Sequence, residues 1–128
     1  MQQYNIRTDI KYRPLEAMDA GALAKSGSDK WWNQSLCTVN DCVMRLGVFE
    51  GEFHWHKHDR EDEVFFVLEG TLLLDIREGE GKGASERTVE LRQHQGMMVP
   101  RGVVHRTRAP KRTVVLMVEA NTVTPTGD

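Results

Sequence analysis

The fold of this chain is decided by residues 51–70, which read GEFHWHKHDREDEVFFVLEG. This stretch places His54, His56 and His58 at every second position, in a chain that contains only five histidines. Side chains alternate between the two faces of a β-strand, so the spacing predicts a strand over 52–58 with three imidazoles on one face. Imidazole is a common metal ligand. The stretch therefore predicts a metal site.

Glu63 follows His58 by five residues, a spacing that would place it on the opposite face of an uninterrupted strand. The intervening residues 59–62 are polar and typical of a turn, which can reset the register. Glu63 then opens the apolar run VFFVL, so its carboxylate is directed toward the protein interior. Burying this charge is costly unless a cation meets it. A metal ion would be such a cation.

A second segment, residues 96–110, supplies a further ligand. Pro100 and Gly102 predict a tight turn, and His105 enters the next strand three residues later. The predicted metal ligands, three nitrogens and one oxygen, are His56, His58, Glu63 and His105. This set suits a divalent iron, manganese, nickel, copper or zinc ion. An ion that takes five or six ligands would keep positions open for water or substrate.

The roles of His54, His94 and Glu63 are open to more than one interpretation. His54 shares the parity of the ligands, so it is either a second-shell or substrate-facing group or an ordinary strand histidine. An alternative ligand set is His54, His56 and Glu61. It is less favoured than the first set because Glu61 lies in the turn, whereas Glu63 begins the apolar strand. Glu63 either stays a ligand or leaves the ion to act as a catalytic base. His94 is predicted to be an exposed residue before a turn.

The remaining chain reads as short strands separated by turn residues. Strands are predicted at 35–39, 42–49, 63–68, 71–77, 88–92, 97–100, 103–108 and 113–120. Their spacing of roughly 8–12 residues is typical of an antiparallel sandwich or barrel. Asn40 and Asp41 form a good turn pair. Glycines alternate in 78–87 as in a flexible hairpin tip, and Phe65, Val67, Leu72, Leu74 and Ile76 are predicted core residues.

The first thirty residues are the least patterned. A short helix is predicted within 14–25, with Pro14 tolerated near its start. This segment either wraps the outside of the domain or gives a strand to a partner subunit.

Length and composition limit the class of protein. The 128 residues suffice for one domain, and the net charge of −2 with interspersed signs argues against a nucleic-acid partner. No apolar run approaches the ~20 residues of a membrane span, and no secretory signal is visible, which predicts a cytoplasmic protein. Cys37 and Cys42 are predicted to be free thiols.

The two histidine segments resemble the two conserved motifs of the cupin family. The first motif corresponds to His56, His58, Glu63 and Gly70, and the second to Gly96, Pro100, Gly102 and His105. Three departures occur: Gly51 lies one residue closer to the first motif than is common, the gap from Gly96 to Pro100 is short, and Ala109 replaces the usual asparagine. The tail also resembles small cupins labelled mannose-6-phosphate-isomerase-like.

The resemblance implies an all-β fold, the cupin double-stranded β-helix or jelly-roll barrel. It implies a single cupin domain over 1–128, with a helical or irregular arm at 1–33, the barrel at 34–120 and a tail at 121–128. A metal in the barrel mouth and a homodimer are expected. The expected function is a metal-dependent enzyme, of the dioxygenase, isomerase or lyase type, acting on a small polar organic molecule. The alternative is a non-catalytic cupin that binds or senses a metal or small molecule.

Overall fold

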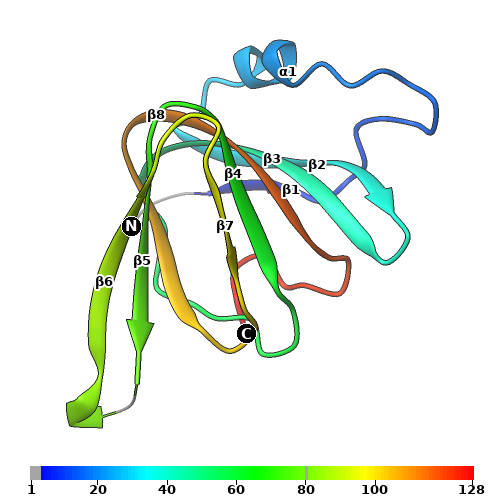
Figure 1. Ribbon diagram of the computed structural model, residues 1–128. Helices are drawn as coiled ribbons and strands as arrows, with labels where there is room; N and C mark the ends of the chain where they lie inside the picture. The colour runs from blue at the N-terminus through cyan, green and yellow to red at the C-terminus, as the bar shows by residue number, and fades with distance from the viewer. Residues whose placement is uncertain (1–3, 80) are drawn as a thin grey trace.

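The computed structural model describes residues 4–79 and 81–128, and it is dominated by strands (Figure 1). The elements are β1 (Asn5–Arg7), α1 (Ala20–Ser26), β2 (Trp31–Val39), β3 (Cys42–Glu52), β4 (Glu63–Glu69), β5 (Leu72–Glu78), the 3-10 turn η1 (Gly81–Gly83), β6 (Ser85–Leu91), β7 (Gly96–Val99) and β8 (Val104–Ala120). The all-β fold predicted from sequence is confirmed. Among the described residues, no helix has the length and apolar character that crossing a membrane requires.

The strand β8 is central to the single eight-stranded sheet, because it pairs with β3, β4 and β5. The hydrogen-bonded order is β1-β2-β3-β8-β4-β7, while β5 pairs with β6 and with the first part of β8. The sequence predicts two strands here, but β8 is continuous. Its register with β3 jumps from Gly51↔Ala109 to Phe49↔Thr113. Pro110, which has no amide hydrogen to donate, falls in this stretch without ladder partners among the described residues.

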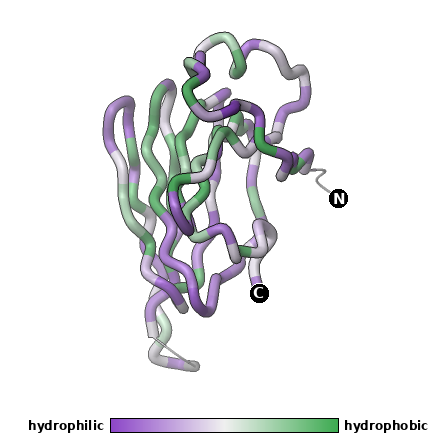
Figure 2. Tube along the Cα trace, turned by 90° about the vertical axis from the view of Figure 1, so that its right-hand side faces the viewer, coloured by the Kyte–Doolittle hydropathy of each residue, from purple (hydrophilic) through white to green (hydrophobic). Residues whose placement is uncertain are grey.

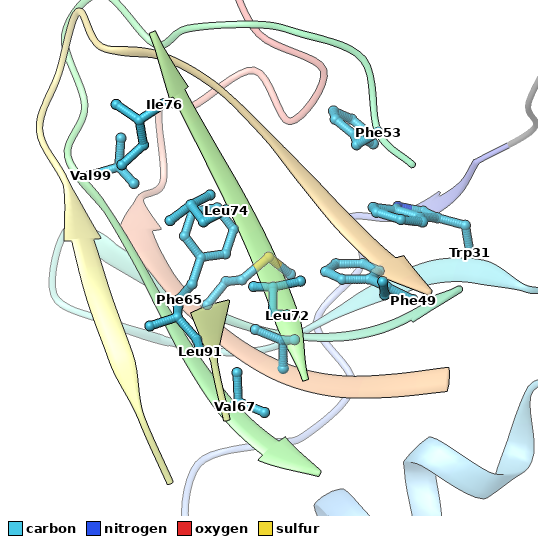
Figure 3. Packing of buried hydrophobic residues seen from close by; sticks show 13 residues of the cluster. Trp31, Phe49, Phe53, Phe65, Val67, Leu72, Leu74, Ile76, Leu91 and Val99 are labelled. Carbon is cyan, nitrogen blue, oxygen red and sulfur yellow. The ribbon is translucent and has the colours of Figure 1, made fainter. Parts of the chain in front are cut away.

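The main core lies inside the barrel (Figure 3). The five residues predicted as core from the alternating pattern are all buried, and Val67, Leu72 and Leu74 are 0% exposed. Trp31, Phe49 and other inward-facing residues of β2, β3, β7 and β8 complete the cluster. Figure 2 shows hydrophobic and hydrophilic residues interspersed along the strands, as expected when one face is buried and the other faces solvent. Period-two alternation therefore identified this core correctly.

The N-terminal arm covers the outer face of the sheet. Leu23 and Ala24 of α1 pack against Trp32 and Leu46 in a second apolar cluster. The predicted helix over 14–25 is wrong in its start, because α1 begins at Ala20. The reason is the side chain of Asp19, whose Oδ1 accepts a hydrogen bond from the Ala22 amide at 2.9 Å and caps the helix. Strand β1 pairs in parallel with β2 of the same chain.

Candidate metal centre

The four residues predicted as metal ligands lie together at the barrel end where β4 and β8 begin. One ligand atom from each of them lies within 4.8 Å of those from the others: His56, His58, Glu63 and His105. The Oε1 atom of Glu63 is 3.5 Å from His58 Nε2 and 3.3 Å from His105 Nε2. Two distant segments of the chain thus converge on one carboxylate oxygen.

The predicted histidine strand over 52–58 is wrong. Strand β3 ends at Glu52, and residues 53–62 form irregular structure. Gly51, with φ of 113°, follows a register shift in the pairing of β3 with β8, which ends one residue later at Glu52↔Arg108. Beyond it, His56 makes an isolated bridge with His105, with N···O distances of 2.9 and 2.8 Å. This bridge brings the imidazole rings of His56 and His105 together; the alternation of side chains along a strand does not.

Backbone carbonyls fix the rings of two ligands. His105 Nδ1 lies 2.9 Å from the Val103 carbonyl oxygen, and His56 Nδ1 lies 3.0 Å from that of His54. A carbonyl only accepts, so each Nδ1 carries the hydrogen and donates it. Each Nε2 is then left with its lone pair. This tautomer is the one that metal-binding histidines adopt.

Several buried polar atoms of the cluster have no protein partner among the described residues. They are His58 Nδ1, His58 Nε2, Glu63 Oε1 and His105 Nε2. Buried polar atoms are nearly always paired, and leaving them unpaired costs about 1–3 kcal/mol each. Three imidazoles and a carboxylate are also the donors that divalent transition metals prefer. The residues present therefore fit a divalent metal ion.

The electrostatics keep two of these groups in the form that binds a metal. Burial alone would raise the pKa of Glu63, but the neighbouring imidazoles of His105 and His58 lower it below its ordinary value. Burial, reinforced by the imidazole of His105, lowers the pKa of His56 to about 4. At neutral pH Glu63 is therefore ionised and His56 is neutral.

The pKa of His58 differs from that of His56 in its direction of change. Burial alone would lower its pKa, but the carboxylate of Glu63, with further contributions from Asp128 and Glu61, raises it. A metal ion must therefore compete with a proton at His58.

The structure adds a buried network that sequence reasoning missed. Glu119 of β8 pairs across from Glu63 of β4. Burial and the charge of Glu63 raise the pKa of Glu119 to about 10, so Glu119 holds a proton at neutral pH. Arg45 lies behind it, with Nε 3.8 Å from Glu119 Oε1, and donates to Ser35 Oγ at 2.9 Å. Glu119 continues the inward alternation of Val115 and Met117, a signal visible in the sequence.

The other residues considered from the sequence lie outside this cluster. His54 is exposed, its ring stacks on Phe53 with 4.3 Å between centroids, and its Nε2 lies 2.7 Å from the Thr126 carbonyl oxygen. Glu61 is buried and accepts a hydrogen bond from Thr122 Oγ1 at 3.0 Å. The alternative ligand set of His54, His56 and Glu61 is not brought together. His94 is exposed in a turn.

A narrow cavity adjoins the cluster. Its walls are mostly apolar, and it encloses about 300 Å³ including its open mouth; it is lined by Trp31, Asn33, Phe49, Phe53, His56, Glu63, Phe65, Thr107, Met117 and Pro125. A larger groove, about 1420 Å³ on the same measure, runs past Tyr4, Lys30 and Arg108, but none of the four clustered residues lines it. The cavity is thus the space that a molecule bound at the cluster would occupy.

Comparisons with known proteins agree with this fold. Residues 42–120 match the cupin domain family (Cupin_2). A Bacillus subtilis (strain 168) protein named Uncharacterized protein YdbB is 44% identical over 98 residues, which cover 77% of this chain and 80% of the relative. A cupin-2 domain containing protein from Shewanella frigidimarina superposes with a TM-score of 0.68 at 26% identity, covering 80% of this chain and 93% of that one. Protein NMB1881 from Neisseria meningitidis has a TM-score of 0.66 at 21% identity, covers 82% and 99%, and shares the fold.

Proposed function

This chain belongs to the cupin family, and from this premise we propose that it is a metal-dependent enzyme acting on a small organic molecule. A divalent iron, manganese, nickel, zinc or copper ion is held by His56, His58, Glu63 and His105. The resemblance to the mannose-6-phosphate-isomerase-like group stays a prediction, as do the homodimer and the cytoplasmic location. Light scattering would test the homodimer.

The observation that carries the proposal is the set of buried donor atoms without partners. Glu63 Oε1, His58 Nε2 and His105 Nε2 are buried at the same point, and none forms a hydrogen bond within the described protein. A bound ion would supply Lewis-acid chemistry and an open coordination position. The protein contributes the ligands, the fixed tautomers of His56 and His105, and a narrow, mostly apolar cavity.

The cavity walls indicate the class of substrate. Phe49, Phe65 and Met117 present apolar surface, while the ligands His56 and Glu63 occupy the polar end. A molecule with oxygen atoms directed at the ion and an apolar part against the aromatic wall fits this division.

The proton-transfer groups near the cavity are few. Apart from the ligands, the polar residues among its described lining are Asn33 and Thr107, and neither titrates. Glu63 lies between two imidazoles and Glu119, which favours a ligand role throughout the reaction. These observations favour dioxygenase chemistry over isomerase or lyase chemistry that needs a separate acid or base.

The alternative is a cupin that binds or senses a small molecule without turnover. The same shortage of acid and base groups favours it. It predicts a metal and a ligand in the cavity, but no reaction.

Oxygen uptake with candidate catechols, thiols and keto acids tests the proposal, with untagged protein loaded anaerobically with each metal. Turnover in the wild type is expected to disappear in His105→Ala, because a ligand is lost, and to persist in His94→Ala, a matched exposed histidine. Unchanged turnover in His105→Ala would overturn the proposed site. Saturable ligand binding without turnover would establish the alternative.

A further inference from the structure

Residues 121–128, here called the closing segment, fold back over the metal-site end of the barrel (Figure 1). Four hydrogen bonds attach them to the irregular stretch that carries the histidines, one of them from Thr122 Oγ1 to Glu61 Oε2 at 3.0 Å. His54 Nε2 lies 2.7 Å from the Thr126 carbonyl oxygen, the Asp59 amide donates to Asp128 Oδ2 at 2.6 Å, and the Asp128 amide donates to the Lys57 carbonyl at 2.9 Å. The segment is therefore docked on the site itself.

The closing segment also forms part of the cavity wall. Pro125 lines the cavity. Gly127, with φ of 95°, packs so closely that a Cβ built on it would lie 2.5 Å from the Cβ of His56. Real Cβ atoms do not approach so closely, so this contact requires glycine. One residue of the segment thus forms part of the cavity wall, and another packs against His56.

With the segment in place, the cavity has little free room. The free space inside it is about 30 Å³, which is room for about two water molecules. An organic substrate does not fit beside the ion in this arrangement. Part of the lining must move to admit it; the strands are held by their ladders, whereas the closing segment and residues 53–62 are irregular.

The closing segment is the part able to move. As described, residues 121–128 form turns and join no strand. Their internal hydrogen bonds are those of short turns, from the Val123 amide to the Ala120 carbonyl and from the Gly127 amide to the Thr124 carbonyl. Segments with few buried apolar contacts open at low free-energy cost.

We propose that residues 121–128 are a mobile closure of the metal cavity, which leaves to admit the substrate and docks again over it. The part that concerns substrate rests on the proposed function, whereas the docking and opening of the segment do not.

Docking also brings a carboxylate to a metal ligand. In the closed arrangement a ring nitrogen of His58 and carboxylate oxygens of Glu61 and Asp128 lie within 4.8 Å of one another. No hydrogen bond joins Asp128 to His58 in the closed arrangement, so the Asp128 carboxylate acts on the site through its negative charge. The closed segment therefore retains the metal more firmly than the open one.

Amide hydrogen exchange in metal-free protein tests the closure without relying on the metal. Gly127→Ala is expected to undock the segment, so exchange at the Asp59 and Asp128 amides accelerates about tenfold or more. The His105 amide in the His56 bridge keeps its protection. Gly79→Ala, also at positive φ but at the distant β5–β6 hairpin, is the control and leaves all of these rates unchanged. Equal exchange in Gly127→Ala and wild type would overturn the proposal.

Release of Co²⁺ to excess EDTA tests the link to the site. In the wild type, release waits for opening, so its rate stops rising at high EDTA concentration. Gly127→Ala is expected to release the ion about tenfold faster. Asp128→Asn is expected to weaken Co²⁺ affinity about tenfold, because a negative charge beside His58 is lost. Wild-type rates and affinity in both variants would overturn the coupling. If wild type binds no Co²⁺, the proposed function fails, while the exchange experiment still decides whether the segment opens.

Discussion

Glu119 offers a sharp test of the electrostatics behind the metal centre, because it holds a proton inside the folded protein. The substitution Glu119→Gln replaces its neutral carboxyl with an amide of similar shape that can still donate to Glu63. The pKa of Glu119 rises from 4.5 to about 10 through burial and the charge of Glu63. The variant is therefore expected to fold and to keep the local geometry.

The sign of the effect follows from proton counting. Between pH 4.5 and about 10 the folded wild type binds one more proton at Glu119 than the unfolded chain. The contribution of this group to the free energy of unfolding therefore falls as pH rises, by about 1.4 kcal/mol per pH unit. Gln has no proton to lose, so the stability of Glu119→Gln relative to wild type should rise by about 3 kcal/mol from pH 6 to pH 8.

Urea unfolding in EDTA at pH 6, 7 and 8 measures this difference. Glu90→Gln, an exposed glutamate on β6, is the control, and its stability difference from wild type should stay within about 0.5 kcal/mol at every pH. A Glu119→Gln difference that does not change from pH 6 to pH 8 would refute the reasoning, since Glu119 would then be ionised in the folded protein.

Three further predictions concern the metal and the core. A divalent ion at a hundred times its Kd should stabilise the fold by about 2.7 kcal/mol, which scanning fluorimetry would record as a rise of about 10 °C in Tm. The same rise in His58→Gln would contradict the proposed metal site. Metal affinity should fall up to about tenfold per pH unit below the raised pKa of His58, because a proton competes with the metal for the ring. Chelator competition measures this affinity, and an affinity that does not change with pH would contradict the prediction. Leu74→Ala, at a fully buried position, should cost about 2–5 kcal/mol in urea unfolding, against less than about 0.5 kcal/mol for the exposed Leu15→Ala; equal costs would contradict the assigned core.

The sequence predicts those parts of the structure that local patterning controls. Alternation identifies Phe65, Val67 and Leu74 as core, because the side-chain period of a strand is two. The turn pair Asn40-Asp41 joins β2 and β3 as expected, with Asn40 at positive φ. Glu63 could be picked out as a ligand because a charge opening an apolar strand demands a partner.

Other features depend on long-range contacts that patterning does not encode. The histidine stretch reads as a strand, but the shift at Gly51 and the bridge from His56 to His105 take it out of the ladder. The start of α1 depends on a cap at Asp19 in a segment without clear periodicity. The closing segment is composed of turn residues, and only its contacts with the distant histidine stretch show where it docks.

The central claim is that one divalent ion sits among His56, His58, Glu63 and His105. Elemental analysis of untagged protein, purified both aerobically and anaerobically, tests it most directly. The account predicts about one transition-metal ion per chain in the wild type and a large loss of that ion in His105→Ala. Wild-type protein that carries no stoichiometric metal by either route, or His105→Ala that retains the full amount, would contradict it.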